Sequence, residues 1–224
     1  MVVLALDTTT RAGSCALVRD SVVMLERSSD TAEYASRLPR DLMLLLDEAG
    51  VDLAGVDVFA VATGPGSFTG LRIGIATMQG LAFAGGKPLI GVSTLDALAR
   101  EAAAARTATW IDAWRGEVYA AVYDGERLAH GPSVVHPADE LERMGGTPTR
   151  FIGDGAAMHR EHIVRTLGEH ATFAMPVTPL LGGTIARLAD EAARRGECPP
   201  PHAIRPLYVR RSDAELVRDA RATR

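Results

Sequence analysis

The residues best suited to chemistry begin at the end of the first apolar run. Residues 2–6 are apolar, and Asp7 follows them with three hydroxyl side chains, Thr8, Thr9 and Thr10. A carboxylate at a strand end can hold Mg²⁺ or its waters, while hydroxyls and backbone N–H groups can face phosphate oxygens. The segment is therefore compatible with a nucleotide loop. The alternative is that Asp and Thr only shape a turn.

A second set of loop residues has the same character. Asp112 also ends an apolar run, and Gly153 and Gly155 flank an aspartate before a predicted helix. Glycines let backbone N–H groups approach a phosphate closely. Asp7 and Asp112 would then face each other around a magnesium nucleotide, with Gly153 and Gly155 on its phosphates. A set of ordinary strand-end turns is the competing interpretation.

The most distinctive segment runs from Gly64 to Arg72, where three glycines and a proline precede a predicted helix. Ser67 or Thr69 can cap that helix, and its free N–H groups would form an anion site. The segment is neither a G-x-G-x-x-G fingerprint nor a Walker A loop. A tight strand-to-helix turn would require the same residue types.

Other reactive side chains are poorly placed for catalysis. His159 and His162 lie one helical turn apart, but their charged neighbours indicate a solvated helix face, so no metal site is predicted. Ser67 lacks the G-x-S-x-G frame of a serine nucleophile. Two cysteines, Cys15 and Cys198, supply neither a zinc site nor a disulfide framework.

The composition of the chain limits the class of protein and the partners that these loops can belong to. The chain has 224 residues, of which 47% are apolar and 23% charged, so it can bury a core. Its net charge of -4 argues against strong binding of nucleic acid by the chain itself. The N-terminus lacks the features of a signal peptide, and no uncharged stretch reaches the roughly 18 residues that cross a bilayer. We expect a cytoplasmic protein without membrane association.

The elements that must position these loops occur twice. The first half contains predicted strands at 2–6, 13–18, 21–25, 56–62 and 89–92 and helices at 34–49, from 71 onward and at 94–105. The second half contains predicted strands at 108–111, 117–123, 126–130 and 151–152 and helices at 137–144 and 156–168. This repetition predicts two α/β lobes, residues 1–105 and 106–211, with a cleft between them and a polar, frayed tail at 212–224. The alternative is the ordinary alternation of an α/β chain.

Two predicted helices of the first lobe are more apolar than one sheet requires. Residues 42–46 form an unbroken apolar run, and no charged residue occurs from Ile73 to Gly86. A helix that packs on one sheet needs an apolar stripe only about 100° wide. The excess predicts a contact with another polypeptide. A thicker intramolecular core is the alternative.

Together these motifs resemble the bacterial TsaB (YeaZ) family. The matching segments are 4–10, 64–74, 91–99, 112–119 and 205–210. The resemblance implies a duplicated RNase H-like, actin-like (ASKHA) α/β fold with a reduced second lobe. It also implies a tRNA-modification role: a dimerisation subunit without established catalysis of its own, acting in the formation of N6-threonylcarbamoyladenosine in tRNA.

The same resemblance implies the partners. These are a TsaD-type transferase, a TsaE-type ATPase and, without them, a second copy of the chain; strong direct tRNA binding is not expected. The helix at 34–49 lacks the His-x-x-x-His by which TsaD holds a metal, so no metal is expected and no cofactor is required. ATP or ADP with magnesium could bind at the complex interface, with Asp7, Asp112 and their loops as a vestigial site. The segment 180–184 slightly resembles the adenosine-binding Gly-Gly turn of actin-like ATPases.

The expected partner surface combines the apolar helices with the glycine–proline segment. It comprises Leu38, Leu42, Leu45, Gly64, Pro65, Gly66, Ser67, Phe68, Thr69, Gly70, Leu71, Arg72, Ile75, Ala76 and Gln79. The alternative function is an autonomous actin-like ATPase or phosphotransferase that uses Asp7 and Asp112 with Mg-ATP. A peptidase, an older label for such relatives, lacks a metal or nucleophile constellation in this sequence.

Overall fold

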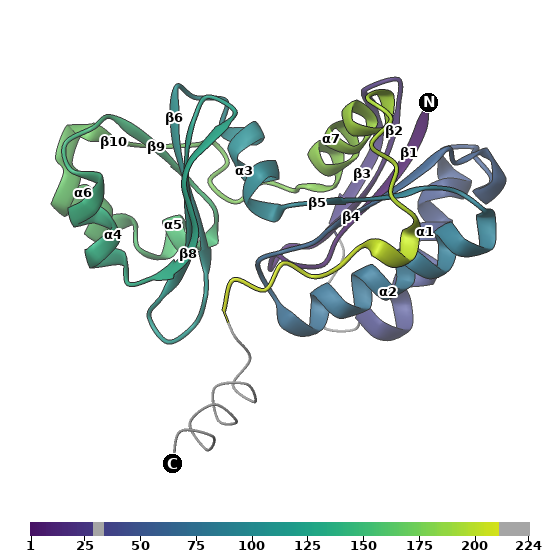
Figure 1. Cartoon of the computed structure of the whole chain (residues 1–224), viewed down its shortest axis with the longest axis horizontal. Coiled ribbons are helices and arrows are strands. Elements are labelled where there is room, and N and C mark those ends of the chain that lie inside the picture. The colour runs from purple at the N-terminus through teal and green to yellow at the C-terminus, as the bar shows by residue number, and fades with distance from the viewer. Residues whose placement is uncertain (29–33, 211–224) are drawn as a thin grey trace, which may run out of the picture.

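Two five-stranded mixed sheets organise the chain (Figure 1). The computed structural model describes residues 1–28 and 34–210, so the expected tail at 212–224 lies outside the described residues. The first sheet has the order β3-β2-β1-β4-β5, from β1 (Val2–Asp7), β2 (Ser14–Arg19), β3 (Val22–Ser28), β4 (Val58–Ala62) and β5 (Leu89–Val92). The second has the order β10-β9-β6-β7-β8, from β6 (Arg106–Asp112), β7 (Val118–Asp124), β8 (Arg127–Val135), β9 (Thr149–Ile152) and β10 (Ala171–Phe173).

The two sheets share one topology, which confirms the duplicated α/β fold. In the first sheet β1 pairs antiparallel with β2 and parallel with β4. In the second sheet β6 pairs antiparallel with β7 and parallel with β9. A hairpin therefore lies on one side of each central strand and crossover connections on the other, as the repeated sequence pattern predicts.

Helices cover both faces of each sheet. They are α1 (Tyr34–Glu48), α2 (Phe68–Gly85), α3 (Thr94–Ala102), α4 (Pro137–Met144), α5 (Asp154–Met158), α6 (Arg160–Leu167) and α7 (Gly182–Arg194), with short 3₁₀ turns at Leu53–Gly55, Gly168–His170 and Pro201–Ala203. Helices α1 and α2 pack on one face of the first sheet, and α5 packs on the second. None of the described helices is both long and apolar enough to span a bilayer.

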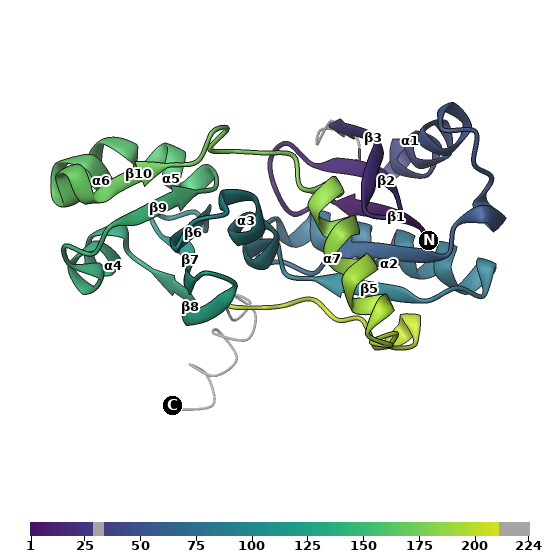
Figure 2. The ribbon, with the colours of Figure 1, turned by 90° about the horizontal axis from the view of Figure 1, so that it is seen from above.

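The two halves of the chain exchange one helix each. Helix α3 belongs to the first half but packs against β6, β7 and β9 of the second sheet. Helix α7 lies within 106–211 but packs against β1, β2, β4 and β5 of the first sheet. In Figure 2, α3 lies between the two sheets and α7 crosses over the first sheet; residues of both helices belong to one apolar core. The expected boundary at 105/106 separates α3 from β6, yet the two lobes are not independent in space.

The chain after α7 forms a strap, residues 195–210, that crosses both lobes. It leaves α7, runs beside α2 and ends against the second lobe, as the yellow segment of Figure 1 shows. Ile204 of the strap is buried in the core beneath α2. The strap therefore brings the C-terminal end of the described chain to the region between the lobes.

Candidate functional site

The Asp7 carboxylate shapes its own loop. It is fully buried. Its Oδ1 accepts hydrogen bonds from the backbone N–H and the hydroxyl of Thr9, both at 2.7 Å, and its Oδ2 accepts one from the Thr10 hydroxyl at 2.5 Å. Since both oxygens are engaged within the loop, Asp7 is not presented to a ligand. The alternative interpretation, in which Asp7 and the threonines after it shape a turn, therefore accounts for this loop.

The glycine–proline segment packs directly on that loop. A Cβ placed on Gly66 would lie 2.4 Å from the carbonyl oxygen of Thr9, and one on Gly70 would lie 2.0 Å from that of Thr8. Ser67 donates its backbone N–H to the Thr9 carbonyl at 2.9 Å, and its hydroxyl caps α2 by accepting from the Gly70 N–H at 3.2 Å. The start of α2 is therefore filled by protein backbone. The two motifs form one packed unit instead of an anion site.

An arginine missed by the sequence analysis faces Asp112. Arg11, in the loop after β1, lies 3.1 Å from an Asp112 carboxylate oxygen and 3.9 Å from one of Asp154. The second Asp154 oxygen accepts from the backbone N–H of Asp112 at 3.0 Å. Burial raises the pKa of the Asp154 carboxyl above its ordinary value, and Arg11 opposes that shift. The cross-lobe contact at Asp112 is therefore an ion pair with Arg11.

A small cavity of about 210 Å³ borders this ion-pair cluster. It is lined by Thr10, Arg11, Ala12, Leu98, Ile111, Gly153, Asp154, Thr178 and Pro179. A Cβ on Gly153 would lie 2.1 Å from the carbonyl oxygen of Trp110, and one on Gly155 would lie 3.0 Å from the backbone of Ile111. Close packing on β6 accounts for both glycines. Among the described residues, no group of three or more His, Cys, Asp and Glu side chains could hold a metal.

The Gly-Gly turn at the start of α7 is also closed by protein groups. Ser14 accepts from the N–H groups of Leu181 and Gly182 at 3.1 and 2.8 Å, and Glu26 accepts from that of Gly183 at 2.8 Å. This turn is the segment, residues 180–184, that slightly resembles the Gly-Gly turn of actin-like ATPases. Because Ser14 and Glu26 cap α7 on the first sheet, and because Asp7 is internally bonded, the described residues do not fit a magnesium nucleotide in the cleft of this chain.

Much of the expected partner surface is buried. The expectation that Leu38, Leu42 and Leu45 face a partner is wrong, because all three lie in the core between α1 and the first sheet. The same correction applies to Gly64, Pro65, Gly66, Gly70, Leu71 and Ile75, which are also buried. Phe68, Thr69, Arg72 and Ala76 are exposed, and Ser67 and Gln79 are partly exposed.

The exposed side of α1 and α2 is apolar at positions that the sequence analysis did not single out. Met43 and Leu44 on α1 are 40% and 45% exposed, and Phe83 on α2 is 85% exposed. Ala76 and Gly80 lie exposed between the ends of α2. These five residues are termed the outer helix face. Within the run at 42–46, helical rotation turns 42, 45 and 46 inward and leaves 43 and 44 outside.

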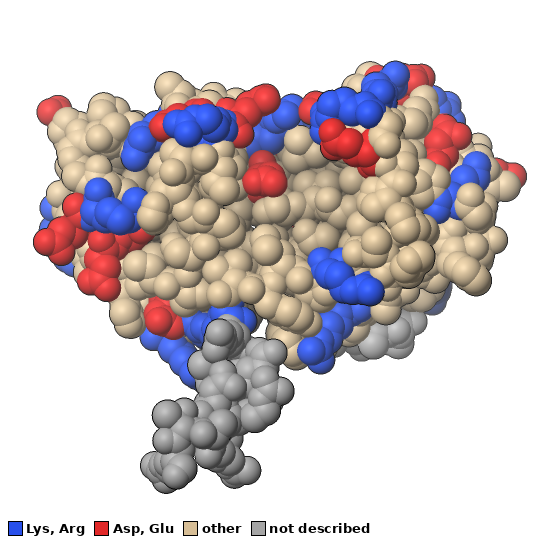
Figure 3. All heavy atoms as spheres, in the orientation of Figure 1, with Lys and Arg blue, Asp and Glu red and all other residues tan. Residues whose placement is uncertain are grey.

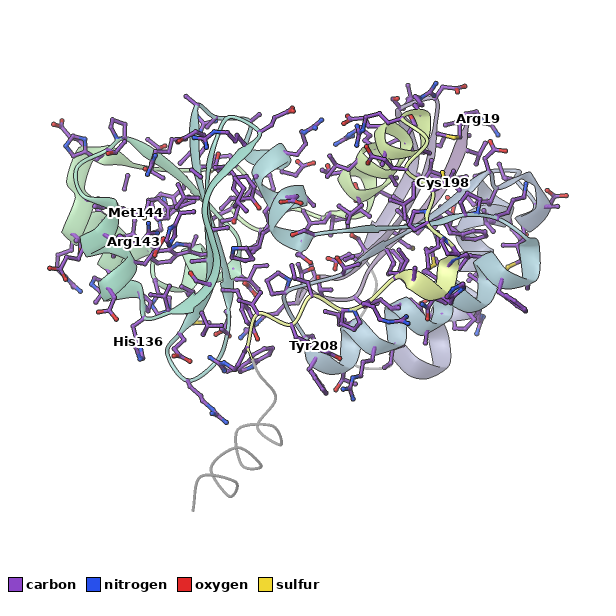
Figure 4. All side chains as sticks on the ribbon, viewed as in Figure 1. Arg19, His136, Arg143, Met144, Cys198 and Tyr208 are labelled. Carbon is purple, nitrogen blue, oxygen red and sulfur yellow. The ribbon has the colours of Figure 1, made fainter. Side chains whose placement is uncertain are left out.

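The strap is held by polar side chains of α2. The Gln79 amide donates to the carbonyl oxygens of Pro201 and Ile204 at 2.9 and 3.2 Å, so its role is intramolecular. Arg72 donates to the Tyr208 hydroxyl at 3.1 Å. Figure 4 shows Tyr208 on the strap beside the start of α2. Arg210 donates to the carbonyl oxygen of Ala113 at 2.8 Å, so the strap bridges the two lobes.

Several known proteins are similar to this chain. The family model described as TsaD, tRNA N6-adenosine threonylcarbamoyltransferase, matches residues 31–215. The tRNA threonylcarbamoyladenosine biosynthesis protein TsaB of Escherichia coli is 38% identical over 65% of this chain and 68% of its own length. TsaB of Bacillus subtilis is 28% identical over 96% of each chain.

Solved structures agree with this relationship. YeaZ from Pseudomonas aeruginosa superposes with a TM-score of 0.76 at 37% identity, over 92% of this chain and 99% of that one. The ethanolamine utilization protein EutJ from Carboxydothermus hydrogenoformans has a TM-score of 0.55 at 14% identity, over 84% of this chain and 89% of that one. The EutJ similarity shows the fold alone.

Proposed function

Because this chain belongs to the TsaB (YeaZ) family and takes part in the biosynthesis of threonylcarbamoyladenosine in tRNA, we propose that it is a non-catalytic scaffold subunit. Its outer helix face docks a TsaD-type transferase as a helical bundle. The observation that carries this proposal is the exposure of Met43, Leu44 and Phe83 on two adjacent helices. Apolar side chains gathered in this way are typical of a surface that another protein covers.

The middle of α2 suits close helix packing. Ala76 and Gly80 are exposed, and no charged residue occurs from Ile73 to Gly85 of this helix. Small residues let another helix approach along the groove between larger neighbours. Met43, Leu44 and Phe83 would then supply the larger apolar contacts. The α2 part of this surface has no charge to desolvate, whereas on α1 the exposed Asp47 and Glu48 lie one helical turn beyond Met43 and Leu44.

A transferase partner and a second copy of this chain would compete for the outer helix face. The family model that describes the transferase also matches residues 31–215 here, so the two proteins have related folds and related first-lobe helices. Self-pairing is therefore the proposed state when the transferase is absent. A TsaE-type ATPase belongs to the same proposal as a component of the assembled complex, and any ATP or ADP would bind at the complex interface.

The docking surface is tested with Ala76→Glu and Phe83→Glu. A carboxylate buried in the interface without a partner costs about 3 kcal/mol, which is roughly a hundredfold in affinity. We expect both variants to lose transferase binding and self-pairing, measured by pull-down and light scattering, with unchanged circular dichroism. Met175→Glu is the matched control, since Met175 is 90% exposed on the second lobe. Wild-type affinity in both α2 variants would contradict the proposal.

The non-catalytic role has its own test. Purified chain incubated with MgATP should show no nucleotide turnover, and the transferase should modify tRNA efficiently only when the chain is added. The Phe83→Glu variant should fail to support the modification because it cannot dock. Turnover of MgATP by the chain alone would support the autonomous ATPase instead.

A further inference from the structure

Three aromatic side chains remain half exposed where the strap passes from the first lobe to the second. Phe68 is 44% exposed, Tyr208 49% and Trp114 51%. The ring centroids of Phe68 and Tyr208 lie 5.6 Å apart. Arg210, two residues beyond Tyr208, donates to the carbonyl oxygen of Ala113, the neighbour of Trp114. The strap therefore joins the turn that carries Trp114 to the pair formed by Phe68 and Tyr208; the three rings are termed the aromatic platform.

The turn between β6 and β7 holds Trp114 in an unfavourable backbone conformation. Trp114 and Arg115 both have φ near 58°, a left-handed region that bulky residues rarely adopt. The Trp114 N–H donates to Asp112 at 2.8 Å, and its carbonyl oxygen accepts from Glu117 at 3.0 Å, which fixes the turn. Strained backbone of this kind is concentrated at binding sites. A glycine or asparagine would satisfy the turn more easily, so the indole itself is the feature that needs explanation.

The surroundings of the platform are basic although the chain is acidic. Residues 63–72, 112–117 and 205–210 contain four arginines and two carboxylates, Asp112 and Glu117, whereas the whole chain has a net charge of -4. Asp112 is paired with Arg11. Glu117 is itself paired with Arg210. The Arg72 guanidinium lies 3.9 Å from the centre of the Phe68 ring. In Figure 3 the blue side chains outnumber the red ones along the lower edge, where the described chain ends.

We propose that the aromatic platform and its arginines bind unpaired nucleotides of tRNA. Exposed aromatic faces stack on unpaired bases, and arginines contact phosphates, which is the chemistry by which proteins hold single-stranded RNA. The inference rests on the proposed function, because the transferase complex supplies the tRNA. The acidic balance of the chain keeps binding by the chain alone weak, and the basic platform adds to the tRNA contacts of the assembled complex.

The chemistry of the platform differs from that of the outer helix face. On α2 the docking residues Ala76, Gly80 and Phe83 lie in an uncharged stretch. At the start of the same helix, the Arg72 guanidinium lies over the Phe68 ring. Cations interleaved with aromatic rings suit an anionic polymer with flat bases. A continuous apolar strip suits another helix. One helix thus carries two surfaces of different character.

The binding experiment uses the full-length chain, alone and with the transferase. The probes are tRNA and a labelled single-stranded RNA of about 16 nucleotides, which exceeds the footprint of a small binding site. Trp114→Asn, chosen because asparagine tolerates positive φ, and Tyr208→Ala should each weaken binding about tenfold. The slope of the logarithm of the binding constant against the logarithm of the salt concentration should be smaller in Arg72→Ala. We expect a decrease of about 0.7 for each phosphate that the guanidinium neutralises in the wild type.

Tryptophan fluorescence gives an independent readout. The chain has two tryptophans, and Trp110 is fully buried while Trp114 is exposed. Stacking of a base on Trp114 should quench the exposed component of the emission. RNA should cause no such quenching in Trp114→Asn. Absence of quenching in the wild-type chain at saturating RNA would contradict the proposal that a base stacks on Trp114.

Matched controls separate this inference from the proposed function. Phe83→Ala removes an exposed ring outside the platform, and Arg127→Ala removes an exposed arginine at the start of β8; both variants should bind RNA as the wild type does. Phe83→Glu should lose transferase binding and keep wild-type RNA affinity, whereas Trp114→Asn should show the weakened RNA binding and keep wild-type transferase affinity. The inference is overturned if Trp114→Asn and Tyr208→Ala retain wild-type RNA affinity, if duplex RNA binds as well as single strands, or if these variants lose the transferase instead.

Discussion

At the residue scale, the glycines of the first-lobe motif act through the space they leave empty. Gly66, Gly70 and Gly74 occur at four-residue intervals, and a Cβ on any of them would lie within 2.4 Å of Thr8 or Thr9. The loop after β1 can therefore lie directly on α2. The distinctive motif is explained by this contact between backbones, and it positions the start of α2 where Phe68 and Arg72 are exposed.

Gly70→Ala should destabilise the chain. The new Cβ would lie 2.0 Å from the Thr8 carbonyl oxygen, and neither the helix nor the buried loop can move freely. Overpacking of this kind costs about 2–3 kcal/mol, which urea denaturation would measure. Gly80→Ala is the matched control in the same helix, because a Cβ there has no neighbour within 4 Å. It should stabilise the helix by about 0.5–1 kcal/mol. Equal stability of the two variants would contradict this account.

Single residues also show where sequence reasoning stops. The sequence placed Asp7 and Asp112 at strand ends, and both lie there. It could not show that Asp7 turns inward to Thr9 and Thr10, because a side chain that shapes a turn and one that binds a metal have the same sequence signature. Arg11 was missed for a similar reason: its contact with Asp112 joins two lobes and leaves no local pattern.

At the element scale, the strands were predicted more reliably than the helices. The two hairpins and central strands follow from apolar runs and turn residues. The helix expected at 156–168 is instead α5 and α6, which meet at His159. The long packed helix α7 was not predicted as an element. Its apolar residues complete the first sheet from the other half of the chain, and such a long-range contact is invisible to local periodicity.

The leucine run of α1 illustrates the same limit. The sequence showed that 42–46 carries excess apolar surface, which the exposure of Met43 and Leu44 confirms. It did not show which leucines face the sheet. A continuous run has no polar position to define its outward side, so the assignment depended on the phase of the helix.

The strap gives an element-scale prediction. Gln79→Leu removes the two hydrogen bonds to Pro201 and Ile204 and should weaken strap attachment by about 1–3 kcal/mol. The Leu207 N–H, which donates to Thr63 at 2.7 Å, should then exchange faster with solvent deuterium. Thr69→Ala, an exposed change on the same helix, should leave that exchange rate unaltered. Wild-type protection in Gln79→Leu would show that the strap is held elsewhere.

At the scale of the whole molecule, the exchanged helices couple the lobes. Each sheet is closed by a helix from the other half of the chain, and α3 and α7 share one apolar core. Unfolding of either lobe would expose apolar surface on both. The lobes should therefore behave as one cooperative unit despite their separate sheets.

Cooperativity is measured with two probes. The fluorescence of buried Trp110 reports on the second lobe, and far-ultraviolet circular dichroism reports on the whole chain. The urea transitions seen by the two probes should coincide. A fragment of residues 1–105 should fail to fold, because it lacks α7 and leaves one face of the first sheet bare. Two separated transitions, or a folded fragment, would refute the coupling.

The position of α7 has a consequence for folding during translation. All five strands of the first sheet lie before residue 93, yet the helix that covers its second face ends only at residue 194. During translation one apolar face of the first sheet therefore stays uncovered until residue 194 has left the ribosome. Nascent chains of this protein should depend on chaperones for most of their synthesis.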